Sequence, residues 1–150
     1  MEDSLQQLTA AGRIVAVESD QSALAASLEE RAGLRLPASY REFISSYEFE
    51  PFEIGGVELY GNASLGEFDD LSVAPFKDKA LHTPLLAAGF FAIGRPDCGS
   101  YDPICLNIGA NPADPAVVRI DHEQMLCHGK VKILKEIAPS FSALARGCVA

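Results

Sequence analysis

Two consecutive segments in the first third of the chain repeat their apolar residues with the period of an α-helix. In SDQSALAASLEERAGLRLP, Leu24, Leu28 and Ala32 recur at intervals of four residues, and Gly33 supplies a left-handed stop. In the next segment, LPASYREFISSY, Pro37 fits the first turn of a second helix. The apolar face of this second helix is predicted to contain Tyr40, Phe43, Ile44 and Tyr47.

After these helices, short apolar runs alternate with turn-forming residues, a pattern that is typical of strands joined by turns. The segment GGVELYG predicts a strand in which Val57 and Leu59 share one face. Three further strands are predicted to start at Phe90 (FFAIG), Asp102 (DPICLNIG) and Ala116 (AVVRID).

Two more helical segments complete the predicted elements. FKDKALHTPLLAAG is expected to be helical, with a turn that restarts at Pro84 and ends at Gly89. A closing helix is predicted near the C-terminus, where Pro139 fits a first turn. The face of this closing helix is predicted to contain Ile137, Phe141, Leu144 and Ala145.

The order of the elements predicts an α+β fold, in which N-terminal helices and a C-terminal helix pack on a mainly antiparallel β-sheet. The connections between the middle strands are too short for repeated parallel crossovers, which favours antiparallel pairing. The length of 150 residues, without linker or repeat, predicts one domain over residues 1–150.

The charge of the chain narrows the classes of partner. Asp and Glu number 21 against 12 Lys and Arg, which gives a formal net charge of -9. Such a chain repels phosphate backbones, so nucleic acid is not expected as a ligand, and a cationic protein is favoured. No apolar run approaches the roughly 20 residues of a membrane span, and the first residues do not resemble a signal peptide. We therefore expect a cytoplasmic location and no membrane association.

The cysteines lack a CxxC pair or any zinc-ribbon spacing. We expect thiols rather than metal ligands, with Cys105 and Cys127 as small buried apolar side chains. The four positions are Cys98, Cys105, Cys127 and Cys148.

Two stretches hold side chains that could carry catalysis. Asp102 is expected to accept backbone hydrogen bonds in a turn, in preference to acting as a catalytic carboxylate. In DHEQMLCH the spacing matches no zinc pattern, so no metal is expected, and a strand end and turn with solvated side chains is predicted. An enzyme would need a cleft in which Asp102, Asp121, His122 and Glu123 converge.

No motif for a cofactor or a nucleophile is present. GxxxxGK and GxGxxG do not occur, and GNASLG around Ser64 has one residue too many before the serine for a nucleophile elbow. We therefore predict no cofactor, no catalytic residue and no enzymatic activity.

An acidic segment between residues 48 and 70 is the candidate partner-binding region. It contains no Lys or Arg, and Phe49, Phe52, Tyr60 and Phe68 are interleaved with its acids. Such a surface could steer and anchor a basic protein; equally, the acids could form a solvated rim and the aromatic side chains could belong to the core. The candidate binding residues are Glu48, Glu50, Glu53, Glu58, Glu67, Asp69 and Asp70.

Four segments in order resemble the SUKH superfamily, the Smi/Knr-type domains. LEERAGLRLPASYREFISSY is similar to its helix, apolar-Pro step and second helix, and GFFAIGRPDCGSYDPICLNIG is similar to its paired strands around a glycine loop. PAVVRIDHE and IAPSFSALA are similar to the strand and the closing helix that follow. The resemblance extends from Leu28 to Ala145. The chain departs from it in having no Trp and in carrying Asn107 where an acidic residue is common.

The resemblance implies a non-catalytic protein-binding module with helices packed on a largely antiparallel sheet. Many bacterial members are immunity proteins that neutralise polymorphic or contact-dependent toxins, often nucleases, by binding them directly. The expectation from this resemblance is a basic toxin domain as partner. A fungal branch acts through regulatory protein contacts, which leaves a regulatory or scaffold domain without a toxin as the alternative.

Overall fold

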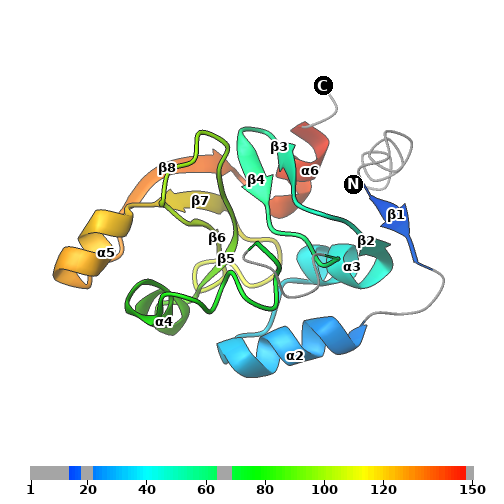
Figure 1. The fold of residues 1–150 in the computed structure, drawn as a ribbon, viewed down its shortest axis with the longest axis horizontal. Helices are drawn as coiled ribbons and strands as arrows, with labels where there is room; N and C mark the ends of the chain where they lie inside the picture. Colours follow the sequence, from blue (N-terminus) through cyan, green and yellow to red (C-terminus); the bar gives the residue numbers. More distant parts are fainter. Residues whose placement is uncertain (1–13, 18–21, 64–68, 148–150) are drawn as a thin grey trace.

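A six-stranded antiparallel sheet forms the centre of the computed structural model, which describes residues 14–17, 22–63 and 69–147 (Figure 1). Each strand pairs with the next strand along the chain. A separate pair of short strands joins β1 (Val15–Ala16) to β2 (Tyr47–Glu48). The strands of the large sheet are β3 (Phe52–Ile54), β4 (Val57–Leu59), β5 (Phe90–Pro96), β6 (Ile104–Asn107), β7 (Val117–Ile120) and β8 (Ile133–Ala138).

The two N-terminal helices, α2 (Ser22–Ala32) and α3 (Ala38–Ser46), lie side by side below and to the right of the sheet in Figure 1. Leu28 on α2 is buried, and so are Tyr40, Phe43 and Ile44 on α3, as the helical period predicts. Together with the antiparallel sheet, these helices confirm the predicted α+β class.

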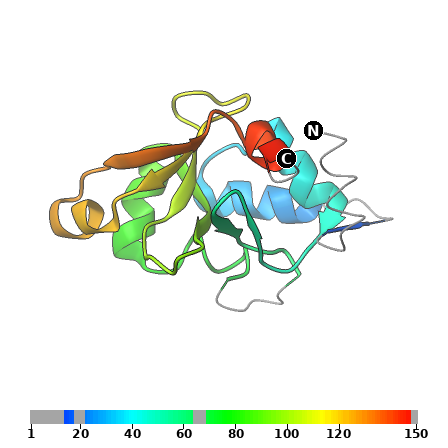
Figure 2. The ribbon, with the colours of Figure 1, turned by 90° about the horizontal axis from the view of Figure 1, so that it is seen from above.

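Helices α4, α5 and α6 also lie around the sheet (Figures 1 and 2). Helix α4 (Lys79–Ala87) contacts β5 and α5 (His122–His128), and in Figure 1 these two helices lie at the end of the sheet away from β1 and β2. Helix α6 (Phe141–Gly147) follows β8 and also contacts β3, so it connects the two edge strands of the sheet.

The aromatic core joins these layers. The Tyr40 ring on α3 lies edge-on to Phe141 of α6, with centroids 5.1 Å apart, and 6.3 Å from Phe91 of β5. Phe43 stacks on Phe49 at 4.6 Å. Aromatic pairs in such geometry stabilise the core beyond their buried area. Among the described residues, no helix combines the length and the apolar character that a bilayer crossing requires.

Several predicted boundaries are wrong. Ile137 lies in strand β8 and not in the closing helix, which starts only at Phe141. Helix α4 continues through Pro84 instead of restarting there, because the missing N–H removes only one bond of the helix. In DHEQMLCH, Asp121 caps the helix α5 that the other seven residues form, so the predicted strand end and turn is wrong. Cys127 on that helix is exposed, whereas Cys105 is buried as expected.

Gly33 ends α2 as the sequence predicts, and the replacement Gly33→Ala tests this role. Its φ is +68°, which an L-residue with a Cβ rarely adopts, and no heavy atom lies within 4 Å of the added Cβ. The strain of an alanine backbone at this φ should therefore lower the free energy of unfolding of Gly33→Ala by about 1 kcal/mol. Urea unfolding should show this loss for Gly33→Ala and a smaller loss for Gly33→Asn, because Asn tolerates the left-handed region. Equal stability of the alanine variant and the wild type would contradict this role.

Candidate functional site

Three of the predicted acids form an exposed acidic surface, which we define as Glu48, Glu50 and Glu53. Glu48 ends β2, Glu50 lies in the connection to β3, and Glu53 lies on β3. Within the part of the chain that the structure describes, their carboxylates make no hydrogen bond or ion pair. Glu48 and Glu50 line a hollow of about 400 Å³ together with Val15, which is 60% exposed. These carboxylates are free to meet a partner.

The sheet register places Glu53 of this surface directly opposite another of the predicted acids. Glu53 on β3 pairs with Glu58 on β4, and Glu58 in turn pairs with Arg95 on β5. The Arg95 guanidinium bonds Glu58 at 2.9 Å. Like charges opposite each other in a sheet repel, and Arg95 neutralises only one of the two. A cation from a partner would therefore be stabilised beside Glu53.

The remaining predicted acids have other surroundings. Asp70 is buried, and its Oδ2 accepts a hydrogen bond from the backbone N–H of Ser72 at 3.0 Å, so it stabilises a turn. Asp69 is half-buried, and Glu67 lies outside the described residues. The structure therefore brings Glu48, Glu50 and Glu53 to the surface and separates Asp70 from them.

The interleaved aromatic side chains belong to the core where the structure describes them. Phe49, Phe52 and Tyr60 are each less than 8% exposed, and Phe68 lies outside the described residues. This agrees with the alternative in which the acids form a rim and the aromatics pack inside. Partner contacts at the acidic surface would thus be mainly electrostatic.

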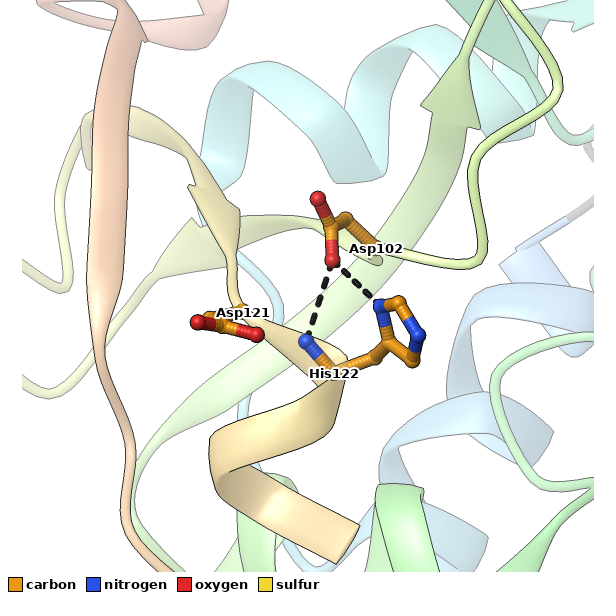
Figure 3. Close-up of side chains that lie close together, drawn as sticks. All are labelled: Asp102, Asp121 and His122. Atoms are coloured by element: carbon orange, nitrogen blue, oxygen red, sulfur yellow. Dashed lines mark hydrogen bonds and ion pairs between the residues drawn. The ribbon is translucent and has the colours of Figure 1, made fainter.

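A second cluster surrounds Asp102, two residues before β6 (Figure 3). Its side chain is 7% exposed, and Oδ2 accepts a hydrogen bond from Arg119 Nε of β7 at 2.7 Å. Oδ1 accepts from the backbone N–H of His122 at 3.1 Å and lies 2.6 Å from His122 Nδ1. The prediction that Asp102 accepts backbone hydrogen bonds within its own turn is therefore wrong, because its carboxylate binds Arg119 and His122. Asp102 instead joins the start of β6 to β7 and α5.

The hydrogen bonds determine the charge of Asp102. Burial by itself would raise the pKa of Asp102, but the bonds from His122 and Arg119 outweigh burial and hold this pKa below its usual value. A carboxylate only accepts, so His122 Nδ1 carries the proton of that bond. In Figure 3 the other ring nitrogen of His122 lies on the side away from Asp102.

Asp121 has a structural role beside this pair. Its side chain accepts hydrogen bonds from the backbone N–H groups of Glu123 at 2.9 Å and Gln124 at 3.4 Å, which makes it the N-cap of α5. Ligand atoms of Asp102, Asp121 and His122 lie within 4.8 Å of one another. A cation between them would have to compete with the helix cap and with Arg119, so the donor set does not favour a metal.

Only some of the four side chains that an enzyme would need in one cleft therefore lie close together. Asp102, Asp121 and His122 come together, whereas Glu123 is exposed on α5. Sequence reasoning missed Arg119, although it is the one charged residue inside the apolar run AVVRI. A charged residue in a buried strand indicates that it pairs with an opposite charge, but the sequence does not identify that partner.

A cavity of about 540 Å³ lies beside this cluster, between α4, α5 and the loop before β6. We call it the α4–α5 cavity. Tyr101 at its rim is 82% exposed, and the Tyr101 and His122 rings lie edge-on with centroids 6.0 Å apart. Its lining includes Leu81, His82, Tyr101, Pro103, His122 and Leu126.

Comparison with family models supports the resemblance found in the sequence. The model of the SMI1 / KNR4 family (SUKH-1) matches residues 21–147, which is most of the chain. A comparison with curated proteins finds no match.

Proposed function

The chain belongs to the SMI1 / KNR4 family (SUKH-1), and on this premise we propose that it is an immunity protein that neutralises a bacterial toxin by direct binding. The family includes immunity-type proteins. In this proposal the partner is a basic toxin domain, such as a nuclease, and the protein acts in the cytoplasm by occluding the toxin.

The observation that supports this function is the exposed acidic surface. Glu48, Glu50 and Glu53 have no cationic partner among the described residues, and Glu53 faces Glu58 across the sheet. A basic active-site face would pair with these carboxylates and relieve their mutual repulsion. The net charge of -9 would also accelerate the encounter with a cationic protein.

The proposed mechanism requires no chemistry from this chain. The carboxylate of Asp102 is occupied by hydrogen bonds from Arg119 and from His122 at the start of α5, and the carboxylate of Asp121 caps α5. Neutralisation would follow from one-to-one occupation of the toxin surface, which calls for a low dissociation constant.

Affinity capture of the tagged protein from its own cells, at low and high salt, tests the proposal. We expect mass spectrometry to identify a basic toxin-domain protein retained near a one-to-one ratio. That protein, expressed alone in a test strain, should arrest growth, and co-expression of this chain should restore growth. Recovery only of non-toxic regulatory proteins that are lost as salt rises would instead support the regulatory or scaffold function and reject immunity.

A further inference from the structure

Strand β8 and the connection before it carry an exposed basic surface, which we define as Lys130, Lys132 and Lys135. Although the chain has a net charge of -9, residues 124–135 contain no Asp or Glu. Within the described residues, the side chains of the three lysines make no hydrogen bond or ion pair. Between the second and the third lysine, Ile133 and Leu134 are 46% and 45% exposed. Exposed apolar side chains with a charged rim are typical of contact surfaces.

The edge of β8 is poorly suited to pairing with a further strand. β8 is an edge strand of the six-stranded sheet, and two register shifts interrupt its pairing with β7. Irregular pairing and lysines are features that protect an edge strand from the addition of another strand. Two copies of β8 side by side would also bring like charges together. A partner must therefore contact the side chains of this segment rather than its backbone.

The acidic surface has the complementary features. Glu48 and Glu50 border a hollow of about 400 Å³, and the rest of its lining is apolar and includes Val15, Pro51 and Phe52. The basic surface thus presents apolar side chains between two lysines, and the acidic surface presents an apolar hollow beside two glutamates. Such a match of charge with charge and of apolar with apolar groups favours contact between the two surfaces.

The two surfaces cannot meet within one chain. In Figures 1 and 2, α5 and the start of β8 lie at one end of the molecule, and β1 and β2 lie at the other end. Strand β3, which carries Glu53, is the edge strand opposite to β8 in the sheet. Contact between the two surfaces therefore requires a second copy of the chain.

We propose that the basic surface of one copy docks on the acidic surface of a second copy, with the exposed apolar side chains of β8 at the hollow. At physiological ionic strength, screening limits the fields of exposed charges to about 8 Å, so the pairs at the contact outweigh the net charge of each copy. This self-association does not depend on the toxin proposed above, because both surfaces belong to this chain.

Sedimentation equilibrium at physiological ionic strength, over a range of protein concentrations, tests the contact. We expect the weight-average mass to rise above the monomer value as the concentration increases. The association should weaken at about 1 M salt, where the screening length falls to about 3 Å. A mass that stays at the monomer value at every concentration would overturn the proposal.

Reversal of the basic surface should disrupt this association. The variant Lys132→Glu with Lys135→Glu has a formal net charge of -13, because each replacement removes one positive charge and adds one negative charge. We expect its association constant to fall at least about tenfold. Arg35→Glu with Lys79→Glu changes the net charge equally at two exposed positions on other elements, and should have a much smaller effect. Equal weakening by the two variants would show that net charge alone matters and would contradict the assigned surface.

A neutral replacement tests the apolar part of the contact. Leu134→Ser should weaken self-association, because it removes an apolar side chain that lies beside the hollow in the complex. The similarly exposed Leu126 lies on α5, and Leu126→Ser should leave self-association unchanged. Equal effects of the two serine variants would place the contact elsewhere.

A charge swap identifies both surfaces together. The variant Glu48→Lys, Glu50→Lys and Glu53→Lys should remain monomeric when alone, and so should the variant Lys132→Glu with Lys135→Glu, because in each of them like charges meet. An equimolar mixture of the two variants should associate, since each reversed surface then meets an opposite charge on the other variant. A mixture that stays monomeric would show that these two surfaces do not bind each other.

Discussion

Replacement of Asp102 by Asn should lower the free energy of unfolding by about 2 to 3 kcal/mol at neutral pH. The amide has the shape of the carboxylate but carries no charge, and its NH₂ group cannot accept a hydrogen bond. The carboxylate oxygens of Asp102 accept from Arg119 Nε on one side and from His122 on the other. In the Asn variant one of these two residues therefore loses its acceptor. Urea unfolding measures the loss, and Asp97→Asn is the matched control. Asp97 is exposed in the same loop, and its replacement changes the net charge equally.

The stabilisation that Asp102 provides should depend on pH, and the same variants can measure this dependence. The pKa of folded Asp102 is lowered, so its stabilisation is fully present above the unfolded value, near 3.8, and is lost as pH falls through the folded pKa. The difference in unfolding free energy between wild type and Asp102→Asn should thus be constant near neutral pH and shrink only in acid. An Asp102→Asn variant as stable as Asp97→Asn would show that this carboxylate is not structural, and would favour a chemical role for it.

Local periodicity is the reason that the N-terminal helices could be predicted. The apolar faces of α2 and α3 repeat within single turns, and Gly33 has the positive φ that its position after a helix suggests. Strands β4 to β7 could also be predicted from the sequence, because short apolar runs between turn-forming residues are typical of buried strands. None of these predictions needed knowledge of distant partners.

Strand β8 and helix α5 could not be predicted in the same way. Most of β8 is exposed, including Ile133 and Leu134, and irregular pairing with β7 interrupts the alternation that identifies a strand. Helix α5 has only seven residues, too few for a periodic signal, and its cap at Asp121 is the main local indication of its start.

The candidate sites depend on register, which a sequence does not display. The hydrogen bonds of Asp102 follow from the pairing of β6 with β7, which brings Arg119 across from the start of β6. The acidic segment was visible in composition, but only the folded structure shows that Glu53 on β3 is exposed while Asp70 in its turn is buried. Burial therefore divides a segment that looks uniform in the sequence.

Reversal of the acidic surface should give the largest effect on partner binding. In the variant Glu48→Lys, Glu50→Lys and Glu53→Lys, each replacement adds two charges, so the formal net charge rises from -9 to -3. We expect the association rate constant with the captured toxin to fall by about 10- to 1,000-fold at low salt, because steering by a complementary field is replaced by repulsion. The three side chains are exposed and make no hydrogen bond or ion pair within the described residues, so the unfolding free energy should change little.

A control with the same net charge separates a local effect from a general one. Glu30, Glu123 and Glu136 are exposed on α2, α5 and β8, away from the acidic surface in sequence, and their reversal also raises the net charge to -3. Stopped-flow association measured at several salt concentrations should show a much steeper loss for the first variant than for the control. If both variants slow association equally, net charge alone explains the effect, and Glu48, Glu50 and Glu53 are not the binding surface. The difference should diminish at high salt, where screening shortens the range of the field to a few ångströms.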